Sequence, residues 1–297
     1  MAVETPPRAA SVEDDVLDTE IAGLDALEIP RSEKSSLRSR LWGGTWPKLI
    51  AIGLVLSSWQ AVVWSGWRPP YLLPGPVEVF ETLFDAAATA TFWQAILITM
   101  QRAAVGFALA IVIGTVIGFA VSRSKVLRSG VGSLITGLQS MPSIAWFPLA
   151  ILLFRLSETA ILFVVVIGAA PSIANGLITG IDHIPPLWMR AGKVLGARGF
   201  AAFRHIVLPG AMPGYVAGLK QGWAFAWRSL MAGELLVIIA NRPSVGALLQ
   251  FNRDQSDAAG LLAMMVVILA IGIAVDTVFG AADRAIRARR GLVDTAA

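Results

Sequence analysis

The chain has 297 residues, of which 56 % are hydrophobic and only 15 % charged, and its mean hydropathy is +0.68. This composition excludes an ordinary water-soluble domain and predicts an all-α integral membrane protein. The sequence has no cysteine, which excludes disulfides and thiolate metal ligands. The formal net charge of +4 comes from basic residues that flank apolar runs, a pattern typical of membrane anchoring and not of nucleic-acid binding.

The first 47 residues are predicted to be a cytoplasmic tail. Their beginning is acidic and lacks aromatic side chains, which favours a mostly mobile segment, with a short amphipathic helix as the alternative. No apolar stretch precedes about residue 48, so we expect the first span, and not a cleavable leader, to be the targeting signal. A transmembrane domain is predicted over 48–292, followed by a short tail at 293–297.

Six apolar runs are each long enough to cross a bilayer core of about 30 Å. They are continuously apolar, which indicates helices and not the alternating strands of a membrane barrel. The predicted spans are 48–66, 96–121, 130–154, 158–180, 211–239 and 258–280.

The basic residues predict the orientation, because cytoplasmic connections carry an excess of Lys and Arg. The connection between the fourth and fifth spans, 181–209, and both termini are therefore expected in the cytoplasm. The basic residues on this side are Arg31, Lys34, Arg38, Arg40, Lys48, Arg123, Lys125, Arg128, Arg190, Lys193, Arg198, Arg204, Arg284, Arg287, Arg289 and Arg290.

The fifth predicted span carries a glycine every fourth residue, at Gly210, Gly214, Gly218 and Gly222. This spacing puts the glycines on one helical face, where another backbone can approach closely. The pattern favours tight packing within one subunit, and it leaves open a two-fold contact between subunits or a smooth pore wall.

The connection at 181–209 is long for a membrane loop and reads as a helix, a break and a second helix. The first helix is expected over about 185–195, Gly196 and Gly199 allow a sharp turn, and the second helix should stop before Pro209. Two short helices at an angle make a compact element through which a soluble motor can move the spans as rigid bodies. A basic connector lying on lipid headgroups is the alternative.

This connection resembles the cytoplasmic loop signature of binding-protein-dependent ABC importer permeases. The signature has Glu-Ala-Ala, then Gly, then an apolar residue with Leu-Pro, and a further Pro. Arg190 stands where Glu is usual, and Gly192 stands where the second Ala is usual. The matching residues are Ala191, Gly196, Ala197, Phe203, Ile206, Leu208, Pro209 and Pro213.

Three further motifs look like the nitrate, sulfonate, taurine and bicarbonate group of these permeases, and most like the aliphatic-sulfonate members. They are Thr99-Met100-Gln101-Arg102 with Gly106-Phe107, Met141 to Leu149, and Glu234; the stretch from Gly222 to Arg228 favours sulfonate. The resemblance covers about 48–292 and implies a type I importer fold in the cytoplasmic (inner) membrane. It implies that ATPase subunits dock on the loop, that a second permease copy pairs with this one, and that an extracytoplasmic binding protein delivers a small anion.

The residues themselves exclude a phosphate-binding loop of the Gly-x-x-x-x-Gly-Lys-Ser/Thr type. The only Gly-Lys pair, Gly192-Lys193, has Leu187 where the first glycine belongs and Val194 after it. We therefore expect the chain to bind no cofactor and to be no enzyme, with ATP and Mg held by the partner ATPase. No metal site is predicted, because His183 and His205 lie at the loop without a carboxylate cluster.

Charged residues within spans are costly and need a partner or a function. Arg102 and Asp276 lie near span ends and are expected at the membrane interface, whereas Arg228 should face protein or water. Arg228 either lines an anion pathway or pairs with Glu234 or another carboxylate to fix helix packing. The candidate pathway residues are Ser140, Ser143, Trp146, Ser172, Asn175, Trp227 and Arg228; the prolines in the third span also allow a bent packing helix instead.

Two other classes of protein remain as alternatives. An ion-coupled secondary transporter would show paired repeats with interrupted helices, and no second half repeats the first. An intramembrane enzyme would need a nucleophile and a base within the bilayer, but both histidines are expected in the cytoplasm.

Overall fold

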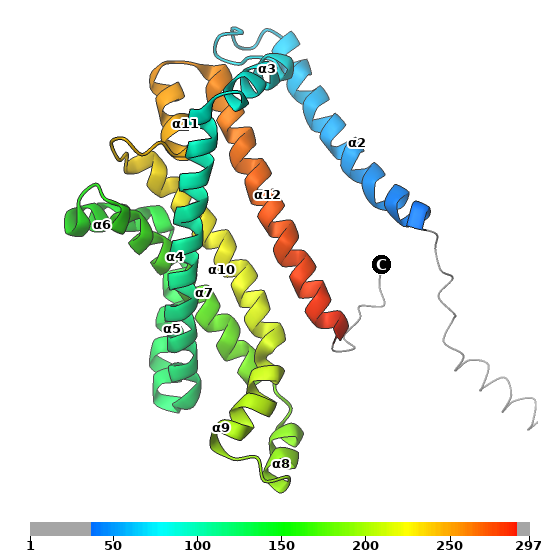
Figure 1. Ribbon diagram of the computed structural model, residues 1–297, viewed down its shortest axis with the longest axis vertical. Coiled ribbons are helices and arrows are strands. Elements are labelled where there is room, and N and C mark those ends of the chain that lie inside the picture. Colours follow the sequence, from blue (N-terminus) through cyan, green and yellow to red (C-terminus); the bar gives the residue numbers. More distant parts are fainter. Residues whose placement is uncertain (1–36, 290–297) are drawn as a thin grey trace, which may run out of the picture. The chain divides into compact units, whose positions relative to one another are not determined.

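The computed structural model describes residues 37–289 (Figure 1). The predicted C-terminal tail at 293–297 and residues 1–36 of the predicted N-terminal tail at 1–47 lie outside the described residues. Residues 37–289 form helices and connecting turns and contain no strand, which confirms the all-α prediction. The chain divides into two compact units between Ala61 and Val62, and each is described by itself.

The first unit contains most of α2 (Leu37–Trp64). Its segment Trp46–Trp64 is long and apolar enough to cross a membrane and agrees with the first predicted span. Pro47 lies inside this helix, just before that segment.

The second unit combines long apolar helices with short connecting ones. The long helices are α4 (Ala90–Arg123), α7 (Glu158–Asp182), α10 (Leu208–Leu236) and α12 (Ala258–Arg289). The short elements are α3 (Pro76–Ala87), α5 (Lys125–Ser140), the 3₁₀ turn η1 (Ser143–Trp146), α6 (Phe147–Phe154), α8 (Pro186–Val194), α9 (Gly199–Ala202), the π-helical turn η2 (Phe203–Val207) and α11 (Val245–Asp254).

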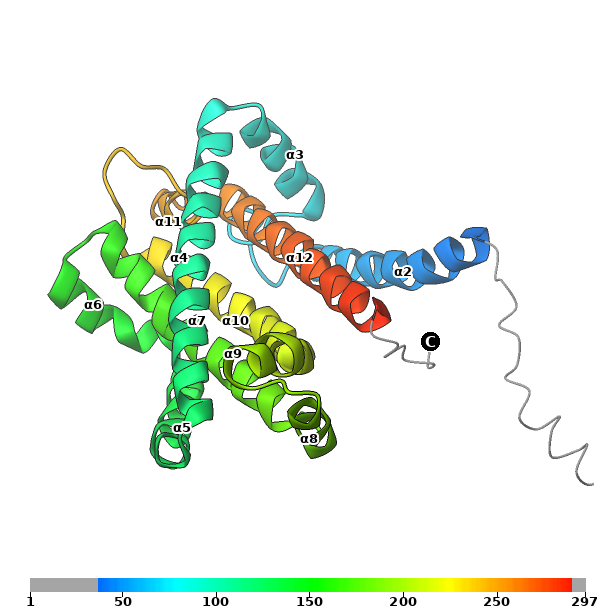
Figure 2. The ribbon, with the colours of Figure 1, turned by 60° about the horizontal axis from the view of Figure 1, so that its bottom comes forward.

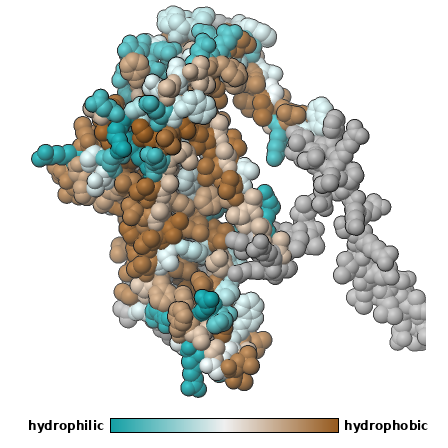
Figure 3. Space-filling view, in the orientation of Figure 1, coloured by the Kyte–Doolittle hydropathy of each residue, from teal (hydrophilic) through white to brown (hydrophobic). Residues whose placement is uncertain are grey.

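The core of the second unit is built around α7, which packs against α4, α5, α6 and α10 (Figure 2). Its inward side chains, among them Val164, Val165 and Ile173, are fully buried. On the face in Figure 3, hydrophobic side chains gather over the middle of the unit and hydrophilic ones lie toward its upper and lower ends. This distribution is typical of a membrane-spanning helical bundle.

The glycine ladder of α10 faces α7 in the same chain. A β-carbon on Gly214 would lie 2.5 Å from the Cα of Gly180, and one on Gly218 would lie 2.7 Å from the Cα of Gly176. The two backbones touch because neither helix has side chains at these positions. Of the three interpretations, tight packing within one subunit is therefore the one that the structure supports.

The predicted third span, 130–154, is not one continuous helix. The segments Gly130–Ser140 and Ser143–Phe154 are bent by 102° at a short break. Met141 at the break is extended, as expected for the residue before Pro142, whose ring disfavours the helical conformation there. The predicted bend is thus present at Pro142, whereas Pro148 lies inside α6.

Fewer of the described helices than the six predicted spans are long and apolar enough, by length and composition alone, to cross a membrane. Among the described residues, four helices are long and apolar enough to cross a membrane, or five if the bent pair counts as one span. The four are α2, α4, α7 and α12. The α10 helix has 29 residues but is not among them, and it carries Lys220, Arg228 and Glu234.

Candidate functional site

The predicted loop folds as a helical hairpin at one end of the second unit (Figure 1). The α8 helix begins at Pro186, whose missing N–H suits the first turn of a helix. The chain then reverses through Gly196 and Gly199, both in the left-handed region at φ +81° and +53°. The N–H of Ala197 donates to the carbonyl of Gly192 at 2.8 Å and closes the turn. The predicted glycine break is therefore present.

The hairpin is held together by a contact between Gly192 and Ile206. Gly192 is buried, and a β-carbon there would overlap Cδ1 of Ile206. Phe203 anchors the second arm to α4, because its ring lies edge-on to Phe119 with centroids 5.2 Å apart. The glycine that replaces the usual alanine is thus the residue that lets Ile206 fit.

The second arm of the hairpin does not stop before Pro209, contrary to the prediction. The π-helical turn η2 is followed directly by α10, and both residues at the junction, Val207 and Leu208, are helical. A proline lacks an N–H and its ring crowds the carbonyl four residues earlier. The chain passes this proline through the wider π turn, so the hairpin is continuous with the long helix α10.

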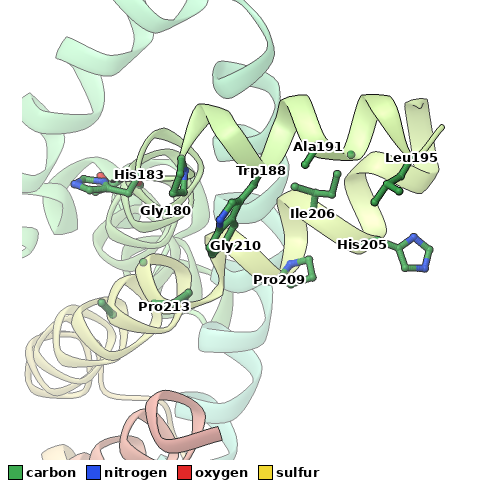
Figure 4. A pocket seen from close by; sticks show the side chains of 15 residues that line it. Gly180, His183, Trp188, Ala191, Leu195, His205, Ile206, Pro209, Gly210 and Pro213 are labelled. Carbon is green, nitrogen blue, oxygen red and sulfur yellow. Dashed lines mark hydrogen bonds between the residues drawn. The ribbon is translucent and has the colours of Figure 1, made fainter. Parts of the chain in front are cut away.

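An open groove of about 1040 Å³ lies between the hairpin and the first turns of α10 (Figure 4). Trp188 and Ala191 of α8 face Ile206, Pro209 and Pro213 across it. The predicted surface histidines, His183 and His205, also line the groove and are exposed, and Nδ1 of each is hydrogen-bonded to the backbone carbonyl four residues earlier.

The tip of the hairpin is apolar, which sequence reasoning missed. Val194 and Leu195 are 87 % and 86 % exposed, and Phe200 is 75 % exposed. The basic residues near them in the sequence are exposed as well and are called the basic rim, namely Arg190, Lys193, Arg198 and Arg204. An apolar tip with a basic rim is typical of a protein-binding surface. The sequence signal for this apolar tip was the pair Val194-Leu195 directly before Gly196, at the turn of the hairpin.

A buried charge cluster lies at the opposite end of the second unit. Glu234 near the end of α10 is fully buried and accepts hydrogen bonds from the Thr99 hydroxyl at 2.9 and 3.0 Å, from the Gly246 N–H at 3.1 Å and from Arg102 Nη1 at 2.9 Å. The Val245 N–H donates to the Thr99 oxygen at 3.0 Å. These bonds join α4, α10 and the start of α11.

Arg102 is the centre of this cluster. Its Nε and Nη2 each donate to the Glu158 carboxylate at 2.7 Å, and Arg242 donates to the same carboxylate at 2.9 Å. Arg102 is only 6 % exposed and is therefore held inside the protein, while its expected depth at the membrane interface stays a prediction. The proposed pairing of Arg228 with Glu234 was wrong, because Arg102 takes that carboxylate. The sequence showed these charges but not which helices meet.

Trp227 and Arg228 line a groove of about 670 Å³ between α10 and α12. The Arg228 side chain is exposed and its guanidinium lies 5.7 Å from the Phe225 ring centroid. Asp276, also in the groove, is exposed and lies 3.5 Å from Lys220. The groove therefore offers a guanidinium and an indole side by side.

The other candidate pathway residues do not line this groove. Ser172 is buried and accepts a hydrogen bond from Gln139 at 3.2 Å, whereas Asn175 on the same helix is exposed. Ser140, Ser143 and Trp146 lie at the break between α5 and α6. The structure brings Trp227 and Arg228 together but does not place all seven in one cavity.

Long apolar helices, a bent helix pair and a helical hairpin at one end define a multi-pass helical membrane protein. Residues 106–288 match the family of binding-protein-dependent transport system inner membrane components. The chain belongs to this family and is an inner membrane protein.

Relatives extend this result. A nitrate import permease protein of Synechococcus elongatus is 30 % identical over 200 residues, which are 64 % of this chain and 71 % of the relative. The taurine transport system permease protein of Escherichia coli is 26 % identical over 212 residues, covering 67 % and 77 %. A putative aliphatic sulfonates transport permease protein of the same organism is 28 % identical over 193 residues, covering 64 % and 72 %.

Solved structures agree on the fold. A chain of the inward-facing methionine ABC transporter MetNI superposes with a TM-score of 0.56 at 19 % identity, over 66 % of this chain and 96 % of that one. The predicted class, the permease subunit of an ABC importer, is confirmed. Family membership therefore decides against the ion-coupled secondary transporter.

Proposed function

We propose that this chain forms the translocation pathway for a small anion of the nitrate, taurine, sulfonate or bicarbonate class, and that separate ATPase subunits drive it. ATP and Mg belong to those subunits in this proposal, and an extracytoplasmic binding protein delivers the solute to a pair of permease copies. The names of the related nitrate, taurine and sulfonate permeases support the solute class.

The observation that carries the proposal is the hairpin joined without a break to α10. Its exposed tip, Val194 and Leu195, offers an apolar contact to a soluble partner, and the basic rim suits an acidic groove. Because η2 runs directly into α10, a force on the hairpin reaches the membrane as a movement of one helix. The docking residues proposed are Arg190, Ala191, Gly192, Gly196, Ala197, Phe203, Ile206, Leu208 and Pro209.

The hairpin end is then cytoplasmic, and the charge cluster lies toward the other side of the membrane. Trp227 and Arg228 are proposed pathway residues, since a guanidinium matches the oxygens of sulfonate, nitrate and carboxylate. Ser140, Ser143, Trp146, Ser172 and Asn175 are proposed for the same path.

The test is uptake of nitrate, taurine and an alkanesulfonate into vesicles that contain the chain with and without its ATPase and binding protein. Uptake should require both partners and ATP. Uptake by the chain alone down an ion gradient would contradict the proposal.

A point substitution tests the docking surface. Leu195→Asp places a charge on the exposed tip and should abolish co-purification of the ATPase without changing the amount of folded permease. The matched control is Val77→Asp in α3, at an equally apolar position 68 % exposed at the opposite end of the unit. Equal ATPase binding by both variants would contradict docking at the hairpin.

A further inference from the structure

Arg102 on α4 links the start of α7 to the end of α10 and, through Glu234, to the start of α11. It bonds Glu158 at the first residue of α7 through two nitrogens and Glu234 in the last turn of α10 through the third. Glu234 in turn holds the first turn of α11 through the Gly246 N–H. All four elements therefore meet at one guanidinium and one carboxylate.

The charges in this cluster balance, and its buried polar groups have partners. Two arginines, Arg102 and Arg242, face two glutamates, Glu158 and Glu234. The charges and hydrogen-bonding groups of this cluster are already paired with one another, which argues against a ligand-binding site here. A buried ion pair adds little net stability compared with an apolar core, and its better-attested use is to fix which elements meet.

The cluster and the hairpin are the two ends of one helix. The 29 residues of α10 span about 43 Å at 1.5 Å per residue, from η2 to the turn that contains Glu234. A push on one end of a stiff helix shifts the whole helix if the other end is free. If the other end is held, the same push tilts the helix about the held point.

We propose that Arg102 is a positioning residue for transport, which holds the Glu234 end of α10 to α4 and α7 so that movement of the hairpin becomes a tilt of α10. The inference rests on the proposed function, because it requires an ATPase to move the hairpin. Loss of the Arg102–Glu234 pair leaves Glu234 with only its Thr99 and Gly246 bonds and weakens the hold on this end of α10, so ATP hydrolysis continues while the solute path opens less often.

The test measures solute uptake and ATP hydrolysis on the same vesicles, with wild-type or variant permease assembled with ATPase and binding protein. Glu234→Gln keeps the side-chain shape and can still accept from Thr99 and Gly246, but it loses the charge that faces Arg102. Uptake should fall about tenfold while hydrolysis persists, so the ATP consumed per solute rises by about the same factor.

A second variant controls for misfolding caused by an unpaired buried charge. The double substitution Arg102→Gln with Glu234→Gln removes one charge of each sign and leaves Glu158 with Arg242, so no uncompensated charge is created. It should raise the ATP-to-solute ratio as Glu234→Gln does. The control Lys220→Gln removes an exposed charge from the middle of α10 and should leave the ratio unchanged.

A wild-type ratio of ATP hydrolysed to solute transported in both assembled variants would overturn the inference. A parallel fall of uptake and hydrolysis would overturn it too, because a purely structural role predicts fewer complexes that each keep the normal ratio. Failure of the proposed function looks different. It would appear in the wild type, as uptake that does not depend on the ATPase.

Discussion

The side chain of Ile206 occupies the space beside Gly192 that a β-carbon would fill, and this contact closes the hairpin. Gly192 lies on α8 and Ile206 on the π turn that leads into α10. The contact therefore sets the angle between the exposed tip and the membrane helix.

Gly192→Ala should open the hairpin. The added methyl group overlaps Ile206, and overpacking of this kind costs about 1–3 kcal/mol. We expect weaker binding of the ATPase and slower uptake, measured by co-purification and by vesicle transport, with the membrane helices still folded.

Pairing Gly192→Ala with Ile206→Ala should restore ATPase binding in part, because the shorter side chain makes room for the new methyl group but also shortens a proposed docking residue. Restoration in the double variant identifies the contact, and not the glycine's backbone, as the cause. A double variant as defective as Gly192→Ala alone would contradict this explanation.

The helical class and the glycine break of the hairpin could be predicted because they depend on local chemistry. Apolar length predicts spans, and Gly196 and Gly199 take the positive φ values that other residues avoid. The continuation through Pro209 could not be predicted, because the π turn that makes room for the proline is set by how η2 packs.

The partners of buried charges depend on which helices meet, and that information is not local. Arg102 and Glu234 are 132 residues apart, and only the packing of α4 against α10 brings them within 2.9 Å. Arg228 lies closer to Glu234 in sequence but is exposed beside Phe225, whereas Glu234 is fully buried, which is why the simpler pairing failed.

Gly218→Ala should destabilise the second unit. Its β-carbon would lie 2.7 Å from the Cα of Gly176, and backbone cannot move aside as a flexible side chain can. We expect a loss of at least about 1 kcal/mol, seen as a lower unfolding temperature of the detergent-purified chain.

Gly137→Ala in α5 is the matched control, because nothing lies within 4 Å of its added carbon. Alanine is a better helix former than glycine by about 1 kcal/mol, so this variant should be as stable as wild type or more stable. An equal loss of stability in both variants would argue against the α7–α10 backbone contact.

Ser229 is the buried polar side chain that lacks a partner among the described residues. Burial without a hydrogen bond costs about 1–3 kcal/mol, so Ser229→Ala should raise the unfolding temperature. Ser229→Val, which adds bulk beside Gly168, should lower it. A lower unfolding temperature for Ser229→Ala would show that the hydroxyl has a partner in the membrane.

Arg228→Gln should slow uptake of an anionic solute while assembly with the ATPase stays normal. The structural alternative for this residue was a pair with Glu234 or another carboxylate, and Arg102 holds Glu234 instead. Arg228 is exposed in a groove beside Trp227, where a fork of N–H donors can meet solute oxygens. Removing a charged hydrogen bond of this kind costs about 1.5–3 kcal/mol, roughly tenfold or more in rate.

Arg228→Lys separates charge from geometry in the same assay. Lysine keeps the positive charge but cannot form two parallel bonds, so uptake should lie between that of wild type and that of Arg228→Gln. Undiminished uptake by fully assembled Arg228→Gln would remove the residue from the pathway, because a side chain that contacts the moving anion cannot lose its charge without changing the barrier that the anion crosses.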